Sequence, residues 1–184
     1  MDEKILVIQN KKEEKILRQR TQDFKFLKKG LVIGRDEFSF RELDDLIRKM
    51  RRIMKEASGV GLSANQVGLP YRMFVAEVLD ADGNLKFYAF FNPRLEFSGK
   101  EKAKMEEGCL SVPGKYGFVE RATSAKLTGL DKRGRALRIK AWGFLAHVFQ
   151  HEVDHLDGKL FIDRAKEIYD IPKVDERLAA KYRK

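Results

Sequence analysis

The chain has 184 residues, with 38 Lys and Arg against 28 Asp and Glu for a net charge of +10, one Cys and three His. This length predicts one domain, and a hydrophobic content of 43% with 13 Phe argues against a disordered protein. A single cysteine excludes an internal disulfide scaffold, and no stretch approaches the ~20 apolar residues needed to cross a bilayer, so we expect no membrane partner and a cytoplasmic location.

The first 58 residues are dense in charge and lean toward helix, and their clearest element is a helix over residues 41–57. Its apolar side chains recur at the i, i+3, i+4 and i+7 positions of an amphipathic helix, namely Leu43, Leu46, Ile47, Met50, Ile53 and Met54. Ser39 or Phe40 lies near its start and Gly59 follows its end. Residues 59–70, punctuated by glycines and a proline, are predicted to form a loop.

Strands are predicted at residues 72–79 and 85–92, with a turn at 80–84 and a stop at Pro93. Further short strands are expected at 117–123, 125–130 and 136–141, with a hairpin turn at 131–134. Neighbours joined by turns favour antiparallel pairing. A second helix is expected from about Trp142 to Leu156, closed by Gly158, and the tail at 165–184 is basic and helix-capable apart from Pro172.

These elements predict an α+β fold in one catalytic domain over residues 1–184. Antiparallel sheets would surround the central helix at 142–156, with the amphipathic helix on the N-terminal side and the basic tail at 165–184 on the C-terminal side.

All three histidines lie in that central helix, and His151 to His155 reads H-E-x-x-H. Each helical residue advances ~100°, so two residues four apart differ by ~40° and project from one face. Both imidazoles can therefore reach one ion, with Glu152 beside a water that the ion activates. The apolar residues among them indicate a packed helix, since Leu145, Val148, Phe149 and Leu156 form a stripe. The pattern predicts metal-assisted hydrolysis.

A catalytic site of this kind needs a third protein ligand, and the residues leave several candidates. Glu167 and Glu176 lie downstream, and Cys109 lies upstream in a segment flanked by glycines and a proline. A lone cysteine also fits a small buried hydrophobe or a nucleophile. As a ligand, its thiolate would complete a His₂Cys site suited to Zn²⁺ or Fe²⁺. His147 is one turn earlier and is expected to line a pocket or face solvent rather than bind the ion.

Three segments carry a family resemblance when taken together: residues 59–66 (GVGLSANQ), 107–111 (EGCLS) and 150–156 (QHEVDHL). In this order they resemble the G-x-G-L-[AS]-A-x-Q, E-G-C-L-S and Q-H-E-x-D-H-L patterns of the peptide deformylases. That family removes the formyl group from the N-terminal formyl-methionine of newly made proteins. The resemblance runs from about Gly59 to Asp163, while residues 1–58 match loosely and 165–184 lie beyond it.

The resemblance implies one divalent metal per chain, Fe²⁺ in the cell with Zn²⁺, Ni²⁺ or Co²⁺ possible in purified protein, bound by Cys109, His151 and His155. It implies that Glu152 is the general base and then the acid. Gln66 and the backbone N–H of Leu110 would stabilise the oxyanion.

The same resemblance implies a peptide substrate, an N-formyl-methionyl nascent chain. Its backbone would pair with Gly61 and the Gly108 region, and its methionine side chain would lie near Val60, Phe144, His147 and Val148. A polar ring at His147 is unusual beside such a pocket, because it narrows the space or makes affinity depend on pH.

Two alternatives accompany this reading: another small metallohydrolase acting on a different amide, and a basic RNA- or ribosome-binding protein with an accidental H-E-x-x-H. The cations are dispersed among 28 acids and no RNA-recognition signature is present, so we expect no direct sequence-specific nucleic-acid binding. The glycines at 59–64 follow a helix and precede a strand, which is the wrong context for a dinucleotide fingerprint. The excess of positive charge favours approach to the anionic ribosome near its exit site.

Overall fold

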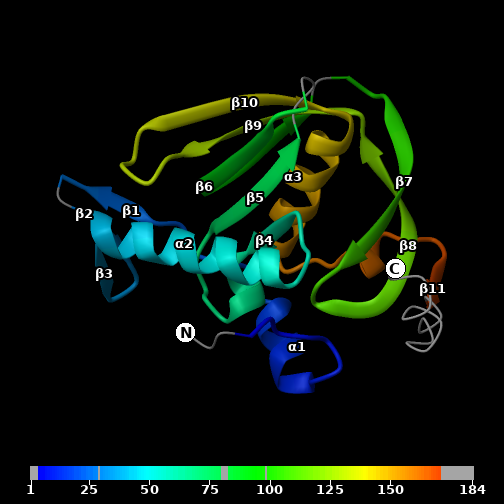
Figure 1. The fold of residues 1–184 in the computed structure, drawn as a ribbon, viewed down its shortest axis with the longest axis horizontal. Coiled ribbons are helices and arrows are strands. Elements are labelled where there is room, and N and C mark those ends of the chain that lie inside the picture. Colours follow the sequence, from blue (N-terminus) through cyan, green and yellow to red (C-terminus); the bar gives the residue numbers. More distant parts are fainter. Residues whose placement is uncertain (1–3, 29, 80–82, 98, 171–184) are drawn as a thin grey trace, which may run out of the picture.

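Five antiparallel strands form the central sheet of the computed structural model, which describes residues 4–170 except 29, 80–82 and 98 (Figure 1). Its order is β10-β9-β6-β5-β4, and the strands are β4 (Gly61–Ser63), β5 (Met73–Leu79), β6 (Leu85–Phe97), β9 (Ser124–Leu130) and β10 (Ala136–Trp142). A second sheet, ordered β11-β8-β7, is made by β7 (Lys102–Cys109), β8 (Val112–Ala122) and β11 (Ile168–Asp170). A third contains β1 (Lys25–Leu27), β2 (Gly30–Ile33) and β3 (Asp36–Ser39).

Three α-helices accompany these sheets in the described part of the chain: α1 (Lys11–Leu17), α2 (Phe40–Glu56) and α3 (Gly143–Leu156). Short 3₁₀ turns occupy η1 (Ala64–Val67) and η2 (Phe161–Asp163). A capping box fixes the start of α2, because Ser39 and Glu42 satisfy each other's backbone N–H groups. None of the described helices combines the length and apolarity that crossing a bilayer requires.

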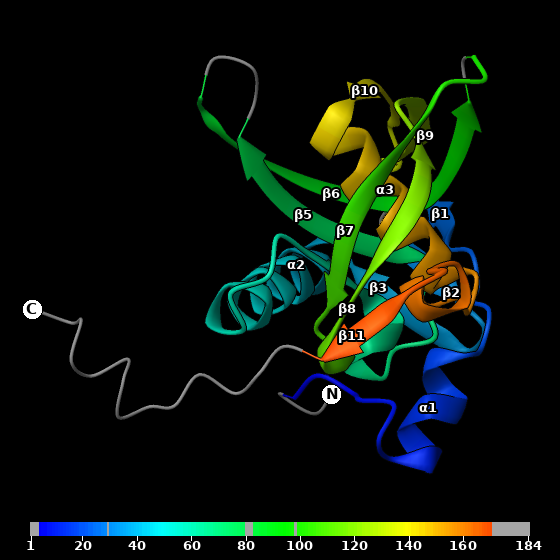
Figure 2. The same cartoon turned by 90° about the vertical axis from the view of Figure 1, so that its right-hand side faces the viewer.

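The central sheet is buried on both faces, and β5 explains how. Met73 and Val75 point into a core built with α2, whereas Phe74, Ala76 and Val78 point into a core built with α3. Alternate residues of a strand face opposite sides, so a strand covered twice is apolar at nearly every position. Helix α3 thus lies between the central sheet and the β7–β8 sheet (Figures 1 and 2).

The sequence-based prediction that Pro93 ends a strand is wrong. Strand β6 continues to Phe97, and its pairing with β9 shifts register between Phe91 and Arg94. Asn92 adopts a positive φ of 50° there, and its side chain bonds both the N–H and the C=O of Phe24 at 2.8 Å. Pro93 is tolerated within the strand because the pairing is interrupted at this bulge, so the backbone N–H that proline lacks is not needed there.

The helical leaning assigned to the first 58 residues is also wrong for part of that segment, where β1, β2 and β3 form a three-stranded sheet. The expected strand at 117–123 begins earlier, since β8 starts at Val112. In the tail, residues 168–170 form a strand paired with β8 rather than a helix, and residues 171–184 lie outside the described residues. The expected helices agree with α2 and α3, and a mixed fold with antiparallel sheets is confirmed.

Candidate metal centre

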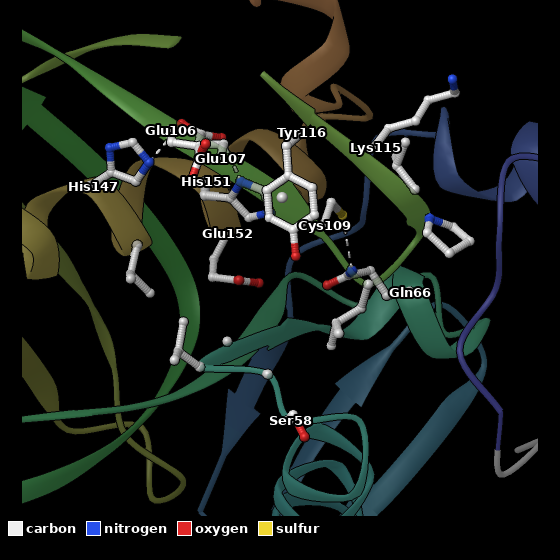
Figure 3. A pocket seen from close by; sticks show the side chains of 18 of the residues that line it. Ser58, Gln66, Glu106, Glu107, Cys109, Lys115, Tyr116, His147, His151 and Glu152 are labelled. Carbon is white, nitrogen blue, oxygen red and sulfur yellow. Dashed lines mark hydrogen bonds and ion pairs between the residues drawn. The ribbon is translucent and has the colours of Figure 1, made fainter. Parts of the chain in front are cut away.

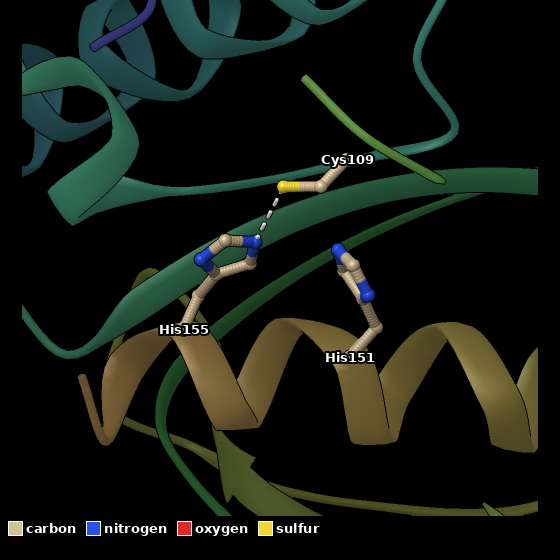
Figure 4. Close-up of side chains that lie close together, drawn as sticks. All are labelled: Cys109, His151 and His155. Atoms are coloured by element: carbon tan, nitrogen blue, oxygen red, sulfur yellow. Dashed lines mark hydrogen bonds between the residues drawn. The ribbon is translucent and has the colours of Figure 1, made fainter. Parts of the chain in front are cut away.

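Cys109, His151 and His155 converge although they come from two separate elements (Figure 4). Each residue offers one ligand atom, and these three atoms lie within 4.8 Å of one another. Nε2 of His155 is 3.1 Å from Sγ of Cys109, and the two imidazole centroids are 4.9 Å apart. Thiolate and imidazole are donors that suit a divalent transition metal, so this trio fits the ion that the sequence predicts.

Glu107 orients the imidazole ring of His151 through a hydrogen bond. Its Oε2 lies 2.8 Å from Nδ1 of His151, and a carboxylate can only accept, so Nδ1 carries the hydrogen and Nε2 keeps its lone pair for a metal. Arg121 donates to both Glu107 oxygens, at 2.7 and 3.0 Å, and also to Asp154. Burial opposes ionisation of Glu107, but its contacts with His147, His151 and Arg121 outweigh burial and hold its pKa well below the usual range.

His155 is held differently. It is 1% exposed, and its backbone carbonyl accepts a 2.6 Å hydrogen bond from the side chain of Asn65. Burial, which disfavours the charged form of the ring, lowers the pKa of His155 well below its ordinary value. The ring is therefore neutral, which is the form that binds a metal.

Glu152 is a buried acid next to His151. It is 3% exposed, and Ser63 donates to its Oε2 at 2.7 Å. Burial raises the pKa of its carboxyl to about 7, against the opposing effects of His151 and the Ser63 hydrogen bond. A side chain at Gly61 would place Cβ 2.2 Å from Oε1 of Glu152, so the glycine gives the acid its space.

Gln66 approaches the cysteine from the 3₁₀ turn η1. Its Oε1 accepts from the N–H of Ser63 at 2.8 Å, which aims Nε2 toward Ser111 Oγ at 3.1 Å and Cys109 Sγ at 3.7 Å. The amide is thus a fixed donor at the edge of the metal-ligand cluster.

A cavity of about 420 Å³ opens over this centre (Figure 3). Its lining contains eleven of the twelve site residues predicted from sequence: Val60, Gly61, Gln66, Gly108, Cys109, Leu110, Phe144, His147, Val148, His151 and Glu152. His155 does not line the cavity, but its Nε2 lies 3.1 Å from Sγ of Cys109, which does. Val60 and Phe144 are half-exposed at 44% and 52%, so two apolar side chains lie at the solvent-exposed edge of the cavity, together with the exposed Ser58 and Glu106.

His147 lines the cavity as expected and does not join the ligand cluster. It is buried at 4% exposure, so a solvated position is ruled out. Its Nε2 lies 2.8 Å from Oε1 of Glu107, a close contact without hydrogen-bond alignment. Glu167, an alternative ligand, is exposed, whereas Glu176 lies outside the described residues.

Sequence reasoning assigned no role to several residues that support the centre, namely Ser63, Glu107, Arg121 and Asp154. All four are buried at 7% exposure or less. Glu107 stands two residues before the cysteine and Asp154 stands inside H-E-x-x-H, so their motifs contained them. Only the folded structure shows that Arg121 donates hydrogen bonds to both Glu107 and Asp154.

Comparison with known proteins connects this centre to a family. The family model described as polypeptide deformylase matches residues 3–170. The chain belongs to the polypeptide deformylase family. A peptide deformylase of Halothermothrix orenii is 47% identical over 124 residues, which cover 67% of this chain and 77% of that protein.

Two solved deformylase structures share the fold. A probable peptide deformylase from Synechococcus phage S-SSM7 has a TM-score of 0.72 at 34% identity, covering 88% of this chain and 98% of its own. A Met-Ala-Ser-bound class I type b peptide deformylase from Acinetobacter baumannii has a TM-score of 0.72 at 30% identity, covering 88% and 96%. This deformylase is therefore a hydrolase that removes the N-formyl group from the N-terminal methionine of newly synthesised proteins, in a family that depends on a metal.

Proposed function

We propose that this deformylase works through a metal held by Cys109, His151 and His155, with Glu152 as the acid and base. The observation that carries the proposal is the convergence of these three ligand atoms within 4.8 Å beside a buried carboxylate. We propose one Fe²⁺ per chain in the cell, with Zn²⁺, Ni²⁺ or Co²⁺ possible in purified protein. When bound, such a cation supplies Lewis-acid activation of water and of the formyl carbonyl.

The chain's own residues then move one proton. Glu152 accepts it from the attacking water as the water oxygen bonds to the formyl carbon, and returns it to the nitrogen as the C–N bond breaks. The products are formate and a free α-amino group. Gln66 Nε2 and the backbone N–H of Leu110 donate to the carbonyl oxygen while negative charge develops on it.

The cavity lining supports a bound peptide. Val60, Phe144, His147 and Val148 would surround the methionine side chain, and the backbones of Gly61 and Gly108 would pair with the peptide main chain. The Acinetobacter baumannii deformylase binds Met-Ala-Ser in its crystal structure, and that peptide begins with methionine. We extend that chemistry to formyl-methionyl peptides here.

Three further features belong to this proposal. A single catalytic domain over residues 1–184 and a cytoplasmic location are consistent with a nascent-chain substrate. The net charge of +10 supports an encounter with the ribosome near its exit site.

The deciding experiment combines metal analysis of anaerobically purified protein with a deformylation assay. We expect about one metal per chain and hydrolysis of formyl-Met-Ala but not of acetyl-Met-Ala. Cleavage of both amides would favour a different metallohydrolase, and protein without stoichiometric metal would favour the basic binding protein. Cys109→Ala should lose its metal on dialysis, and full retention would contradict the His₂Cys site.

A further inference from the structure

The edge strand β10 of the central sheet carries an exposed side that the metal centre does not use (Figure 1). Alternate residues of a strand point to opposite sides. One side of β10 packs into the core shared with α3, at Leu137, Ile139 and Ala141. The other side holds three exposed residues, Arg138, Lys140 and Trp142.

Two neighbouring strands extend this exposed side. Arg138 and Lys140 pair in register with Thr128 and Lys126 of β9, and these pair in turn with Arg94 and Glu96 of β6. Directly paired residues lie on the same side of a sheet. We call this surface the β10 face, and its members are Arg94, Glu96, Lys126, Thr128, Arg138, Lys140 and Trp142. It thus contains four cations and one acid.

Two of the four cations already have partners. Arg94 forms an ion pair with Asp23, and Lys126 forms one with Glu96. The hydrogen bond from Lys126 holds the pKa of Glu96 below its ordinary value, so this acid is ionised and its charge is neutralised by Lys126. The pairs leave the other two cations of the β10 face to attract a ligand.

Arg138 and Lys140 are those two cations, and both are exposed. Neither has an ion-pair partner within the described residues. Although cations and acids are mixed over the chain as a whole, residues 124–142 hold six Lys or Arg and a single acid, Asp131. This part of the surface therefore complements an anion.

Trp142 adds an aromatic ring to the same row. It is the one tryptophan of the chain and is 65% exposed, whereas tryptophan is usually well buried. Two residues of a strand span about 6.6 Å, so Arg138, Lys140 and Trp142 follow one another at equal steps. Successive nucleotides of an extended single strand repeat at a similar distance.

We propose that the β10 face binds single-stranded RNA, with phosphates on Arg138 and Lys140 and a base stacked on Trp142. Phosphates complement the two unpaired cations, and an unpaired base offers a flat surface on which tryptophan stacks. A duplex hides its base faces, and a membrane surface offers none. Neither cations nor stacking read base identity, so the binding does not depend on sequence.

The β10 face adjoins the catalytic cavity but contributes nothing to its metal ligands. Trp142 is followed by Gly143, whose positive φ of 54° turns the chain into α3, and then by Phe144 at the cavity edge. RNA bound on this face therefore lies beside the cavity entrance. Because the family acts on newly synthesised proteins, RNA rather than DNA is the nucleic acid near its substrates.

Trp142 provides its own signal for the first test. Dodecauridylate, a single strand of twelve nucleotides, should quench the tryptophan fluorescence of the full chain to saturation. We expect a dissociation constant of about 1–100 µM near physiological salt, the range of binding that does not read sequence. No quenching at about 1 mM dodecauridylate would overturn the proposal.

The second test separates the β10 face from net charge. Arg138→Ala/Lys140→Ala and the control Lys11→Ala/Lys12→Ala each remove two exposed cations, the latter from α1. Fluorescence anisotropy of labelled dodecauridylate gives both affinities. In the first variant we expect Kd to rise at least about fivefold and the slope of log K against log salt to weaken by about 1.4, since each single-strand phosphate contact contributes about 0.7. The control should change Kd less than about twofold, and equal losses in both would overturn the assignment.

Stacking is tested at the tryptophan itself. Trp142→Ala should raise Kd at least about fivefold in the anisotropy assay, whereas Trp142→Phe keeps an aromatic ring and should lose less. An unchanged Kd in Trp142→Ala would overturn the stacking contact.

Two other anionic partners are compared with the same protein. Dodecauridylate annealed to its complement should bind at least about fivefold more weakly than the single strand, because its bases are already stacked. Vesicles of phosphatidylcholine and phosphatidylserine should leave Trp142 fluorescence unchanged. Tighter binding of the duplex or of the vesicles would assign the β10 face to that partner instead.

Each variant is also assayed for hydrolysis of formyl-methioninamide and for thermal unfolding. Arg138→Ala/Lys140→Ala should match the wild type in both, because its two positions lie outside the cavity lining. A loss of RNA affinity together with unchanged hydrolysis locates the effect on the β10 face. If Trp142→Ala fails to fold, Trp142→Phe and the cation variants still decide the proposal.

Discussion

Glu152 is the acid on which the proposed chemistry depends, and it is not a proposed ligand. We therefore expect Glu152→Ala to keep its metal while kcat falls by at least about 10²-fold, the lower end of what a general base contributes. Metal analysis and the deformylation assay on the same preparation check both parts. Glu152→Gln preserves the side-chain volume. An equal fall in kcat in that variant would show that the loss comes from the missing carboxylate and not from the space that alanine leaves.

Glu120→Ala is the control for this substitution. Glu120 is an acid of β8 whose side chain is 53% exposed, and it lies outside the catalytic cavity. It should match the wild type in metal content and rate. Substantial activity in Glu152→Ala would remove Glu152 from the mechanism.

The residues that carry chemistry were predictable because their spacing is local. His151, Glu152 and His155 follow from helical geometry, whereas Cys109 was one of several candidate third ligands until the family resemblance selected it. The supporting charges were not predictable, since Glu107, Arg121 and Asp154 meet only after β7, β8 and α3 have packed together. A buried charge needs a partner, but the sequence does not say which one.

At the scale of elements, the periodicity of apolar residues identified those elements that are long or that are buried on both faces. Helix α2 has a clear apolar stripe, and β5 is apolar at nearly every position. Strands β1, β3 and β11 span only three or four residues and are largely exposed, so their pattern is too short to detect. Strand β7 alternates charged and partly buried side chains, and its pairing with β8 rather than its composition defines it.

Helix α2 is tied to β5 by a buried acid, and this contact predicts how stability depends on pH. Glu77 of β5 forms an ion pair with Lys55 at 3.0 Å and a second one with Arg51, and both cations belong to α2. Burial opposes ionisation of Glu77, but these cations outweigh it and lower its pKa. Because water screens the half-exposed cations, we expect Glu77→Gln to lower the free energy of unfolding by about 1 kcal/mol at pH 7.

The sign follows from the lowered folded-state pKa. The stabilisation is complete above the unfolded pKa of about 4.3 and is lost as the pH falls through the folded value. The difference between wild type and Glu77→Gln, measured by urea unfolding, should therefore shrink between pH 7 and pH 3. A difference that grows toward acid pH would contradict the assignment. Glu37→Gln, an exposed acid of β3, should have little effect at either pH.

At the scale of the whole molecule, the charge is positive but not segregated. The excess of ten cations is spread over a sequence that also holds 28 acids, and several exposed cations pair with neighbouring acids, as Arg135 does with Asp131 at 2.6 Å. A field of this kind steers the protein toward an anionic surface without reading base sequence. We propose that this field brings the deformylase to ribosomes, where formylated chains emerge, independently of the chemistry in the cavity.

Salt tests that separation. Binding to ribosomes by a net positive surface releases counterions, so the dissociation constant should rise at least about threefold between 50 and 200 mM salt, with a linear dependence of log K on log salt concentration. Over the same range, KM for the uncharged substrate formyl-methioninamide should change less than about twofold, because no long-range attraction is involved. Co-sedimentation and the peptide assay give the two quantities. Ribosome binding that does not weaken with salt would mean that the net charge plays no part in reaching the substrate.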